Sequence, residues 1–350
     1  MKSLFYSTTL LLISVPAALA YPRLMPMSPE TETISLLVKT EPLALVNGSP
    51  CLFMVRSSQS LKALSGLWQK HRVFFNFNGT DNTWYGLAAI GIETVSGRYP
   101  LTLTATLASG ELNTSNHSIQ IQKTAYRTAN LGVSEIFTQP DAETLERIGQ
   151  ERELKNRVFS MVTEARLWNG RFVSPVHNQV TEEFGVRRTF NAGRSRGHRR
   201  RGRQSRARRH KVVLQRSPRQ TRIRQSRVRR LKPKGRQTTR IDQPPRFHQG
   251  LDYRAATGTP VAAMNSGRVV LARDLFYEGG FVVIDHGQGL LTLYLHLSQI
   301  QATEGQMVKK GETVGLSGAT GRVTGPHLHV GVRWQGVYLN PETLLTLDLR

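Results

Sequence analysis

The sequence predicts a mainly β protein in which one helical segment separates two β-rich regions. Three observations support this prediction. Short apolar runs separated by turn residues fill positions 34–122, apolar residues recur at helical spacing between 140 and 170, and short glycine-rich runs return after Phe172. Regular short strands divided by turns are typical of β-sandwiches, whereas a period of 3.6 residues indicates a helix. The chain of 350 residues is long enough for two or more domains.

The first β-rich region, residues 30–125, is expected to form an immunoglobulin-like β-sandwich. Apolar residues alternate with other residues along two of its runs, which places their side chains on one buried face. These residues are Phe75, Phe77, Leu101, Leu103, Ala105 and Leu107. Asn78-Gly79 and Ser109-Gly110 mark turns. The expected strands are Ile34–Val38, Leu52–Val55, Val73–Phe77, Tyr85–Ile92, Tyr99–Leu107 and Ser118–Gln122. Cys51 is the only cysteine, so no intrachain disulfide can form.

A helical connector is expected within residues 126–172. Pro140-Asp141 is a typical start, because Asp141 complements the positive end of the helix dipole. Apolar residues at helical spacing follow, and Asn169-Gly170 is expected to end the helix. These apolar residues are Leu145, Ile148, Val158, Met161, Val162 and Ala165.

The N-terminus has the pattern of a secretory signal peptide over residues 1–20. Lys2 precedes an apolar run from Leu10 to Val15, and Ala18-Leu19-Ala20 resembles a cleavage site. A membrane-spanning helix needs about 20 apolar residues, and this run is too short. We therefore expect export to the periplasm or cell envelope, with no transmembrane anchor after signal cleavage.

The second β-rich region, residues 173–350, is interrupted by a basic insert at 193–246. Residues 194–240 contain 21 Arg and Lys but no Asp or Glu, whereas the rest of the chain is close to neutral. Such a segment cannot bury enough apolar surface to offset its ordering entropy, so disorder is expected. Because the insert has no aromatic residue for base stacking, we expect it to bind anionic envelope polymers or lipids rather than a specific nucleic acid. Nucleic-acid binding stays an alternative, as does an insertion without function.

Two histidine patterns stand out near the C-terminus. His248 precedes Asp252 by four residues, and His327 and His329 flank Leu328 in an apolar run. Residues i and i+2 of a strand point to one side, so both imidazoles of that run should face together. A catalytic zinc site uses three N or O ligands and keeps one position open for water. His248, Asp252 and one of the paired histidines supply such a set, and the other histidine could accept a proton.

Three segments together resemble the signature of M23 (LytM-type) zinc peptidases. They are His248-x-Gly250-x-Asp252, Tyr294-x-His296 and Gly325-Pro326-His327-Leu328-His329. Further similarity is seen in Gly258-Thr259-Pro260-Val261, Gly267-Arg268-Val269-Val270, Ile284-Asp285-His286-Gly287, Gly318-Ala319-Thr320-Gly321 and the run from Val180 to Arg188. The resemblance covers nearly all of 173–350 except the insert, which separates the run ending near Asn191 from His248.

This resemblance implies an antiparallel β-sheet groove with metal ligands on its floor. His248, Asp252 and His329 would bind Zn²⁺, while His296 and His327 would be the catalytic pair. The implied activity is endopeptidase cleavage of the peptides that cross-link peptidoglycan. His286 is expected to be structural, and His198, which lacks an aspartate four residues later, is not a candidate ligand. The alternative is a non-catalytic LytM-like protein that activates other wall hydrolases.

Overall fold

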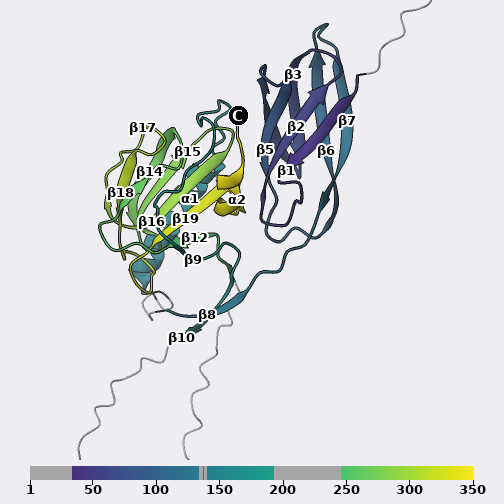
Figure 1. The fold of residues 1–350 in the computed structure, drawn as a ribbon. Helices are drawn as coiled ribbons and strands as arrows, with labels where there is room; N and C mark the ends of the chain where they lie inside the picture. The colour runs from purple at the N-terminus through teal and green to yellow at the C-terminus, as the bar shows by residue number, and fades with distance from the viewer. Residues whose placement is uncertain (1–33, 134–136, 138–139, 193–245) are drawn as a thin grey trace, which may run out of the picture.

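The fold is mainly β, as predicted, and consists of two β-rich parts joined by a linker with a helix (Figure 1). The computed structural model describes residues 34–133, 137, 140–192 and 246–350. The expected signal peptide and nearly all of the basic insert lie outside these residues. Within the described part of the chain, no helix is long and apolar enough to cross a membrane.

The N-terminal part is a β-sandwich whose two layers are joined through one shared strand (Figure 1). Its strands are β1 (Leu36–Glu41), β2 (Pro50–Ser57), β3 (Leu61–Trp68), β4 (His71–Asn78), β5 (Thr83–Ala89), β6 (Gly97–Leu107) and β7 (Leu112–Ile121). They pair antiparallel in the order β1-β2-β5-β4-β3-β6-β7. The first half of β4 pairs with β3 and its second half with β5. This change of partner lets one continuous path of strands fold into two layers.

Large apolar side chains fill the space between the two layers. Phe53 on β2 and Trp68 on β3 are fully buried, with ring centroids 5.3 Å apart. The Trp68 indole donates a hydrogen bond of 3.0 Å to the carbonyl of Ala89, which satisfies its one polar group. The predicted alternation along β6 is confirmed, because Leu101, Leu103 and Ala105 are fully buried. Cys51 is a buried free cysteine.

Two details of the sandwich differ from the prediction. Strand β3, which contains Gly66, was not expected, and Gly66 packs closely against Phe75, whose ring would lie 3.0 Å from a Cβ atom added at this position. Phe77 was expected on the buried face but is 52% exposed and packs on Trp84 at 5.1 Å. Phe75 and Phe77 pair with β5 in one register, and Phe77 lies one residue before the end of β4, so it is exposed at the end of the strand and not through a change of face.

The C-terminal part is a ten-stranded sheet that continues from β17 through β14, β15, β16, β19 and β12 to β9, with three strands attached at its sides. Its elements are β9 (Val180–Glu182), β12 (Gly250–Tyr253), β13 (Pro260–Ala262), β14 (Gly267–Leu275), β15 (Gly279–Asp285), β16 (Leu290–Ile300), β17 (Met307–Val308), β18 (Thr313–Ser317), β19 (Leu328–Trp334), β20 (Val337–Leu339) and α2 (Pro341–Thr346). The antiparallel sheet is as predicted.

A small separate sheet joins the linker to the two ends of the insert. Its strands are β8 (Thr128–Val133), β10 (Arg187–Ala192) and β11 (Arg246–Phe247). Strand β8 runs parallel to β10, and β10 pairs antiparallel with β11. The segments before and after the insert, β10 and β11, are therefore adjacent and hydrogen-bonded to each other.

Helix α1 spans Ala142–Ser160 and packs on the C-terminal sheet. Asp141 caps its start, as predicted, by accepting a hydrogen bond of 2.9 Å from the Thr144 amide. The predicted end at Asn169-Gly170 is wrong. After Ser160 the chain becomes extended, and its carbonyl and amide groups bond the β15–β16 turn instead of continuing the helix. Met161 and Val162, which were expected on the apolar face of the helix, lie after its end and are exposed, and Leu145 within the helix is exposed as well.

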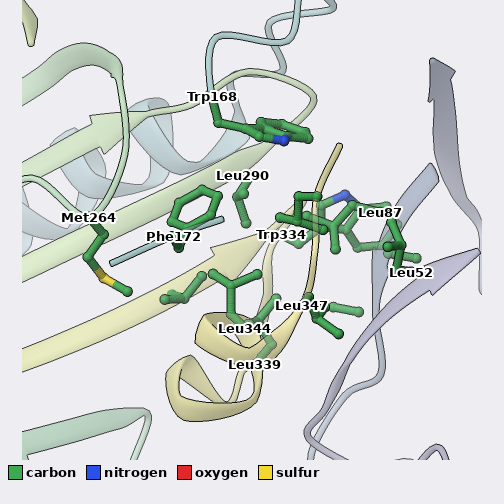
Figure 2. Close-up of a cluster of buried hydrophobic side chains, with 14 of the residues drawn as sticks. Leu52, Leu87, Trp168, Phe172, Met264, Leu290, Trp334, Leu339, Leu344 and Leu347 are labelled. Carbon is green, nitrogen blue, oxygen red and sulfur yellow. The ribbon is translucent and has the colours of Figure 1, made fainter. Parts of the chain in front are cut away.

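The two β-rich parts pack against each other through an apolar contact around the C-terminal helix. In Figure 2, Leu52 and Leu87 of the sandwich lie near Trp334 and Leu347 of the C-terminal part, within one cluster of buried side chains. Hydrogen bonds at its edge include one of 2.7 Å from the Asn340 amide to the sandwich. The linker therefore joins two parts that also share a core.

Candidate metal centre and its groove

His248 lies between β11 and β12, directly after the basic insert, and is 1% exposed. Its backbone is held on both sides, because its amide donates to Val186 and its carbonyl accepts from Gly185, each at 2.8 Å. Its Nδ1 lies 2.8 Å from the Glu183 carbonyl and so carries the hydrogen. The other ring nitrogen, Nε2, therefore presents a lone pair toward Asp252. The insert does not displace this histidine.

Asp252 on β12 lies directly opposite His329 on β19. Residues paired in this way share one face of an antiparallel sheet, and the His329 Nδ1 lies 2.7 Å from Asp252 Oδ1. The second carboxylate oxygen, Oδ2, accepts a hydrogen bond of 2.9 Å from Arg188 on β10. Arg188 also pairs with Glu182. The arginine thus fixes the carboxylate and leaves Oδ1 facing the two histidines.

The three donor atoms have the chemistry and spacing of a metal site. His248 Nε2 lies 3.1 Å from Asp252 Oδ1 and 3.0 Å from His329 Nδ1, and all three ligand atoms lie within 4.8 Å of one another. A zinc ion about 2.0–2.2 Å from each donor requires donor separations of roughly 3.3 Å in tetrahedral geometry. Small side-chain movements suffice to admit it. The lone pair of His248 Nε2 faces the Asp252 carboxylate oxygen, and two such electron-rich atoms repel each other. A cation between them would remove this repulsion.

His327 stands just before β19 and faces the same site. Its amide donates to Gly318 at 3.2 Å, and its Nδ1 donates to the Gly325 carbonyl at 2.8 Å. The remaining nitrogen, Nε2, lies 3.8 Å from Asp252 Oδ1. His327 and His329 line the groove while Leu328 between them is fully buried. The predicted alternation along this run is confirmed.

His296 reaches the site through an irregular backbone. It is on β16 next to Leu295, which pairs with His329 and lines the groove. Neighbouring residues of a regular strand point to opposite faces, so His296 would point away. Its φ of +64°, a left-handed value, turns its side chain into the same groove. Its Nδ1 donates to the Thr320 carbonyl at 2.9 Å, and its ring lies 4.9 Å from that of His327.

The groove that contains these residues has a volume of about 740 Å³. Its floor includes apolar side chains of the sheet, namely Phe281, Leu293 and Leu295. Lys155 and Phe159 of α1 form part of one wall, and Ile92 and Glu93 of the sandwich line it as well. A groove of this size with a polar centre and an apolar floor suits a short peptide.

Burial and neighbouring charges set the protonation of the site. Burial and the nearby histidines lower the pKa of His296 to about 3, so this ring is neutral at pH 7. Burial also lowers the pKa of His329. Burial alone would raise the pKa of Asp252, but its hydrogen bonds and charge interactions with His248 and His329 outweigh this and hold the pKa well below its usual value. A lowered pKa for both Asp252 and His329 favours the ionised carboxylate and the neutral imidazole, which are the forms that bind a metal.

The structure brings together all five residues that the sequence predicted for the site. His286 is elsewhere, fully buried, with its Nδ1 2.7 Å from the Ser266 carbonyl and its Nε2 2.8 Å from the Thr292 hydroxyl. His198 lies outside the described residues. Sequence reasoning missed the contact of Arg188 with Asp252, although Arg188 belonged to a segment that matched the family. Nothing in the sequence separates this arginine from its neighbour Arg187.

The fold and the site define a class of β protein with a histidine- and aspartate-lined groove, and comparison with known proteins identifies the family. Residues 246–341 match the model of Peptidase family M23, and this part of the chain is a peptidase M23 domain. A crystal structure of an M23 peptidase from Pseudomonas aeruginosa has the same fold, with a TM-score of 0.56, 21% identity, and coverage of 86% of this chain and 94% of that one.

Two bacterial proteins resemble the C-terminal part in sequence. Peptidoglycan DD-endopeptidase ShyA of Vibrio cholerae is 52% identical over 82 residues, which cover 23% of this chain and 19% of that protein. DD-carboxypeptidase/endopeptidase Mpg of Neisseria meningitidis is 45% identical over 99 residues, which cover 28% of this chain and 23% of that protein. The matched segments thus span about a fifth of the length of these relatives.

Proposed function

We propose that this protein is a zinc-dependent endopeptidase that hydrolyses peptide cross-links of peptidoglycan. The observation that supports this most directly is the convergence of His248, Asp252 and His329 on one point beside two further histidines. The relatives named as peptidoglycan DD-endopeptidases support the choice of substrate. The export expected from residues 1–20 agrees with that substrate, and the periplasm or cell envelope is the proposed location.

In this proposal His248, Asp252 and His329 hold the zinc ion. A bound zinc ion lowers the pKa of water toward 7 and polarises the carbonyl of the scissile bond. Neighbouring residues orient two of these ligands. The Glu183 carbonyl holds the His248 ring, and Arg188 holds the Asp252 carboxylate.

His296 and His327 transfer protons and stabilise the negative charge that forms during the reaction. Each imidazole donates from Nδ1 to a backbone carbonyl, so each keeps Nε2 unprotonated in its neutral form. One of these nitrogens accepts the proton of the attacking water and then delivers a proton to the leaving amine nitrogen. The other, when protonated, donates a hydrogen bond to the oxygen on which negative charge develops. The apolar floor beside them excludes water from the peptide.

The test is digestion of purified cross-linked muropeptides by the full chain loaded with zinc. We expect loss of the cross-linked species in the wild type and no loss in His329→Ala, as measured by liquid chromatography with mass spectrometry. His177→Ala, which changes an exposed histidine outside the groove, is the matched control and should act like the wild type. Identical products from the wild type and His329→Ala would overturn the proposal. A zinc content below about 0.3 equivalents after metal repletion would favour the non-catalytic activator instead.

We also propose that residues 194–240 attach the protein to anionic envelope polymers or lipids. The charge of this segment supports the proposal, since arginine binds phosphate and carboxylate groups well. Deleting 194–240 should leave the zinc content unchanged and lower the retention on anionic vesicles at low salt. Retention that does not change with the deletion or with salt would contradict it.

A further inference from the structure

Three hydrogen bonds from one short segment hold the proposed metal ligand His248. Its Nδ1 donates to the Glu183 carbonyl, and its amide donates to the Val186 carbonyl, both at 2.8 Å. Its own carbonyl accepts from the Gly185 amide, also at 2.8 Å. On its N-terminal side, only the two-residue strand β11 joins His248 to the basic insert. The position of this ligand therefore depends on residues 183–186.

Tyr126, which lies in the linker between β7 and β8, packs directly on this segment. A Cβ atom added to Gly185 would lie 2.1 Å from the Tyr126 ring, so the ring occupies the space that a side chain would need. The ring also makes edge-on contacts with Phe184 and Phe247, at centroid distances of 6.2 and 6.1 Å. Aromatic pairs in this geometry stabilise a structure beyond the area that they bury. Because Phe247 directly precedes His248, Tyr126 touches both the segment that holds the ligand and the strand that leads to it.

The hydroxyl of Tyr126 is bonded to the sandwich. It donates to the carbonyl of Asn47, a buried residue of the sandwich. The side chain of Asn47 is itself held at both ends, because it accepts from the Thr124 amide at 2.9 Å and donates to the Ile92 carbonyl at 2.6 Å. Burial raises the pKa of Tyr126 to about 12, so the hydroxyl keeps its proton at neutral pH. The ring of Tyr126 is therefore attached to a fixed point of the sandwich.

We propose that Tyr126 is a positioning residue, through which the linker and the sandwich hold the metal ligand His248 in place. The inference rests on the proposed zinc site, but Tyr126 itself lies outside the groove. The ring restricts the movement of residues 183–186, and the hydroxyl connects that restriction to the sandwich. A ligand that is held in its bound position before the metal arrives loses less conformational entropy on binding. The sandwich thereby contributes to metal affinity without supplying a ligand.

The first test measures the zinc affinity of the full chain by competition with a chromogenic chelator. Tyr126→Leu removes the ring contacts and the hydroxyl, and should weaken zinc binding by about 10-fold or more, as for other residues that orient a metal ligand. Tyr126→Phe keeps the ring but loses one hydrogen bond, and should weaken zinc binding by about 2- to 10-fold. Wild-type affinity in Tyr126→Leu would overturn the proposal. Wild-type affinity in Tyr126→Phe would overturn the proposed contribution of the sandwich.

Two control variants separate positioning from a general loss of stability. Tyr99→Phe removes another tyrosine hydroxyl, which donates to the Val95 carbonyl within the sandwich. Leu154→Ala shortens a half-buried residue of α1 that packs against the cluster of Val158 and Phe281, and should lower the melting temperature. Both controls should bind zinc with wild-type affinity. The visible absorption spectrum of cobalt(II) bound in place of zinc reports the geometry of the ligands, and it should change in Tyr126→Leu but in neither control.

Hydrogen exchange of the metal-free chain separates this inference from the proposed function. Tyr126→Leu should speed exchange at least about 10-fold in the peptides that contain Gly185 and His248, as measured by mass spectrometry, whereas Tyr99→Phe should not. If the wild type binds no zinc, the proposed function fails, and this exchange decides whether Tyr126 holds His248. Unchanged exchange overturns the inference, and so does unchanged zinc affinity in a wild type that binds zinc, which leaves the peptidase function standing. If Tyr126→Leu does not fold, Tyr126→Phe decides both comparisons.

Discussion

The two β-rich parts of the chain use their interiors for different purposes. The sandwich buries few polar side chains, and its histidines His71 and His117 are only half-buried. The C-terminal part has a larger set of buried polar residues, which includes His248, Asp252 and His296. Burying a polar group costs free energy unless a partner compensates it. The difference therefore marks the part of the molecule whose interior serves a chemical purpose as well as stability.

The largest expected effect comes from removing a ligand in the polar interior. His248→Ala should lower zinc content to near zero and reduce hydrolysis by about 10³-fold or more, because the metal supplies several kcal/mol of transition-state stabilisation. His117→Ala, which changes a histidine of the sandwich, should leave both within twofold of the wild type. Zinc analysis and muropeptide digestion measure the two effects. A fully active His248→Ala would show that the buried polar residues of the C-terminal part do not serve catalysis.

A second change separates proton transfer from metal binding. His296→Ala should reduce kcat by roughly 10²–10⁴-fold while zinc content stays at one equivalent. His296→Asn is the sharper variant, because asparagine tolerates the positive φ of this position but cannot carry the proton. Both variants should be equally inactive. An active His296→Asn would show that the position matters for its backbone shape and not for its imidazole.

Acid should weaken the C-terminal part through its other buried histidine. Burial lowers the pKa of His286 to about 4. Below pH 6.5 the His286 ring binds a proton in the unfolded chain but stays neutral in the native one. The free energy of unfolding therefore falls as the pH drops from 6.5 toward 4, by about 3 kcal/mol for this group. Urea unfolding at pH 7 and pH 4.5 measures the loss, which His286→Asn should reduce and His177→Asn should not. An equal loss in wild type and His286→Asn would contradict the assignment.

The smallest effect is expected at the arginine that orients the aspartate. Arg188→Gln should weaken zinc binding by about 10- to 100-fold, because partners that orient a metal ligand contribute this much. The neighbouring exposed Arg187→Gln is the matched control and should bind zinc like the wild type. Competition with a chromogenic chelator measures both affinities. Equal affinities would mean that β12 alone positions the carboxylate.

Much of the fold and the site was predictable because it depends on local patterns. Alternating apolar residues predicted β6, and the resemblance of three short segments to M23 peptidases predicted which residues meet in the groove, whereas the spacing alone left open which of His327 and His329 binds the metal. The end of α1 was not predictable, since it depends on hydrogen bonds between residues after Ser160 and the β15–β16 turn, which is distant in the sequence. The same holds for Arg188, whose partner Asp252 is distant in sequence. The left-handed backbone of His296 was not predictable either, because no glycine marks this position and histidine also occurs in regular strands.

The pairing of β10 with β11 has a consequence for how this chain can change in length. Arg188 and Arg246 are directly opposite, so the 57 residues between them start and finish at one point of the fold. The entropy cost of closing a flexible loop rises only with the logarithm of its length, by about 0.6 kcal/mol for each doubling. Segments of very different size can therefore be exchanged at this point while His248 keeps its place. The same position is a natural attachment point for adding a foreign binding module to the enzyme.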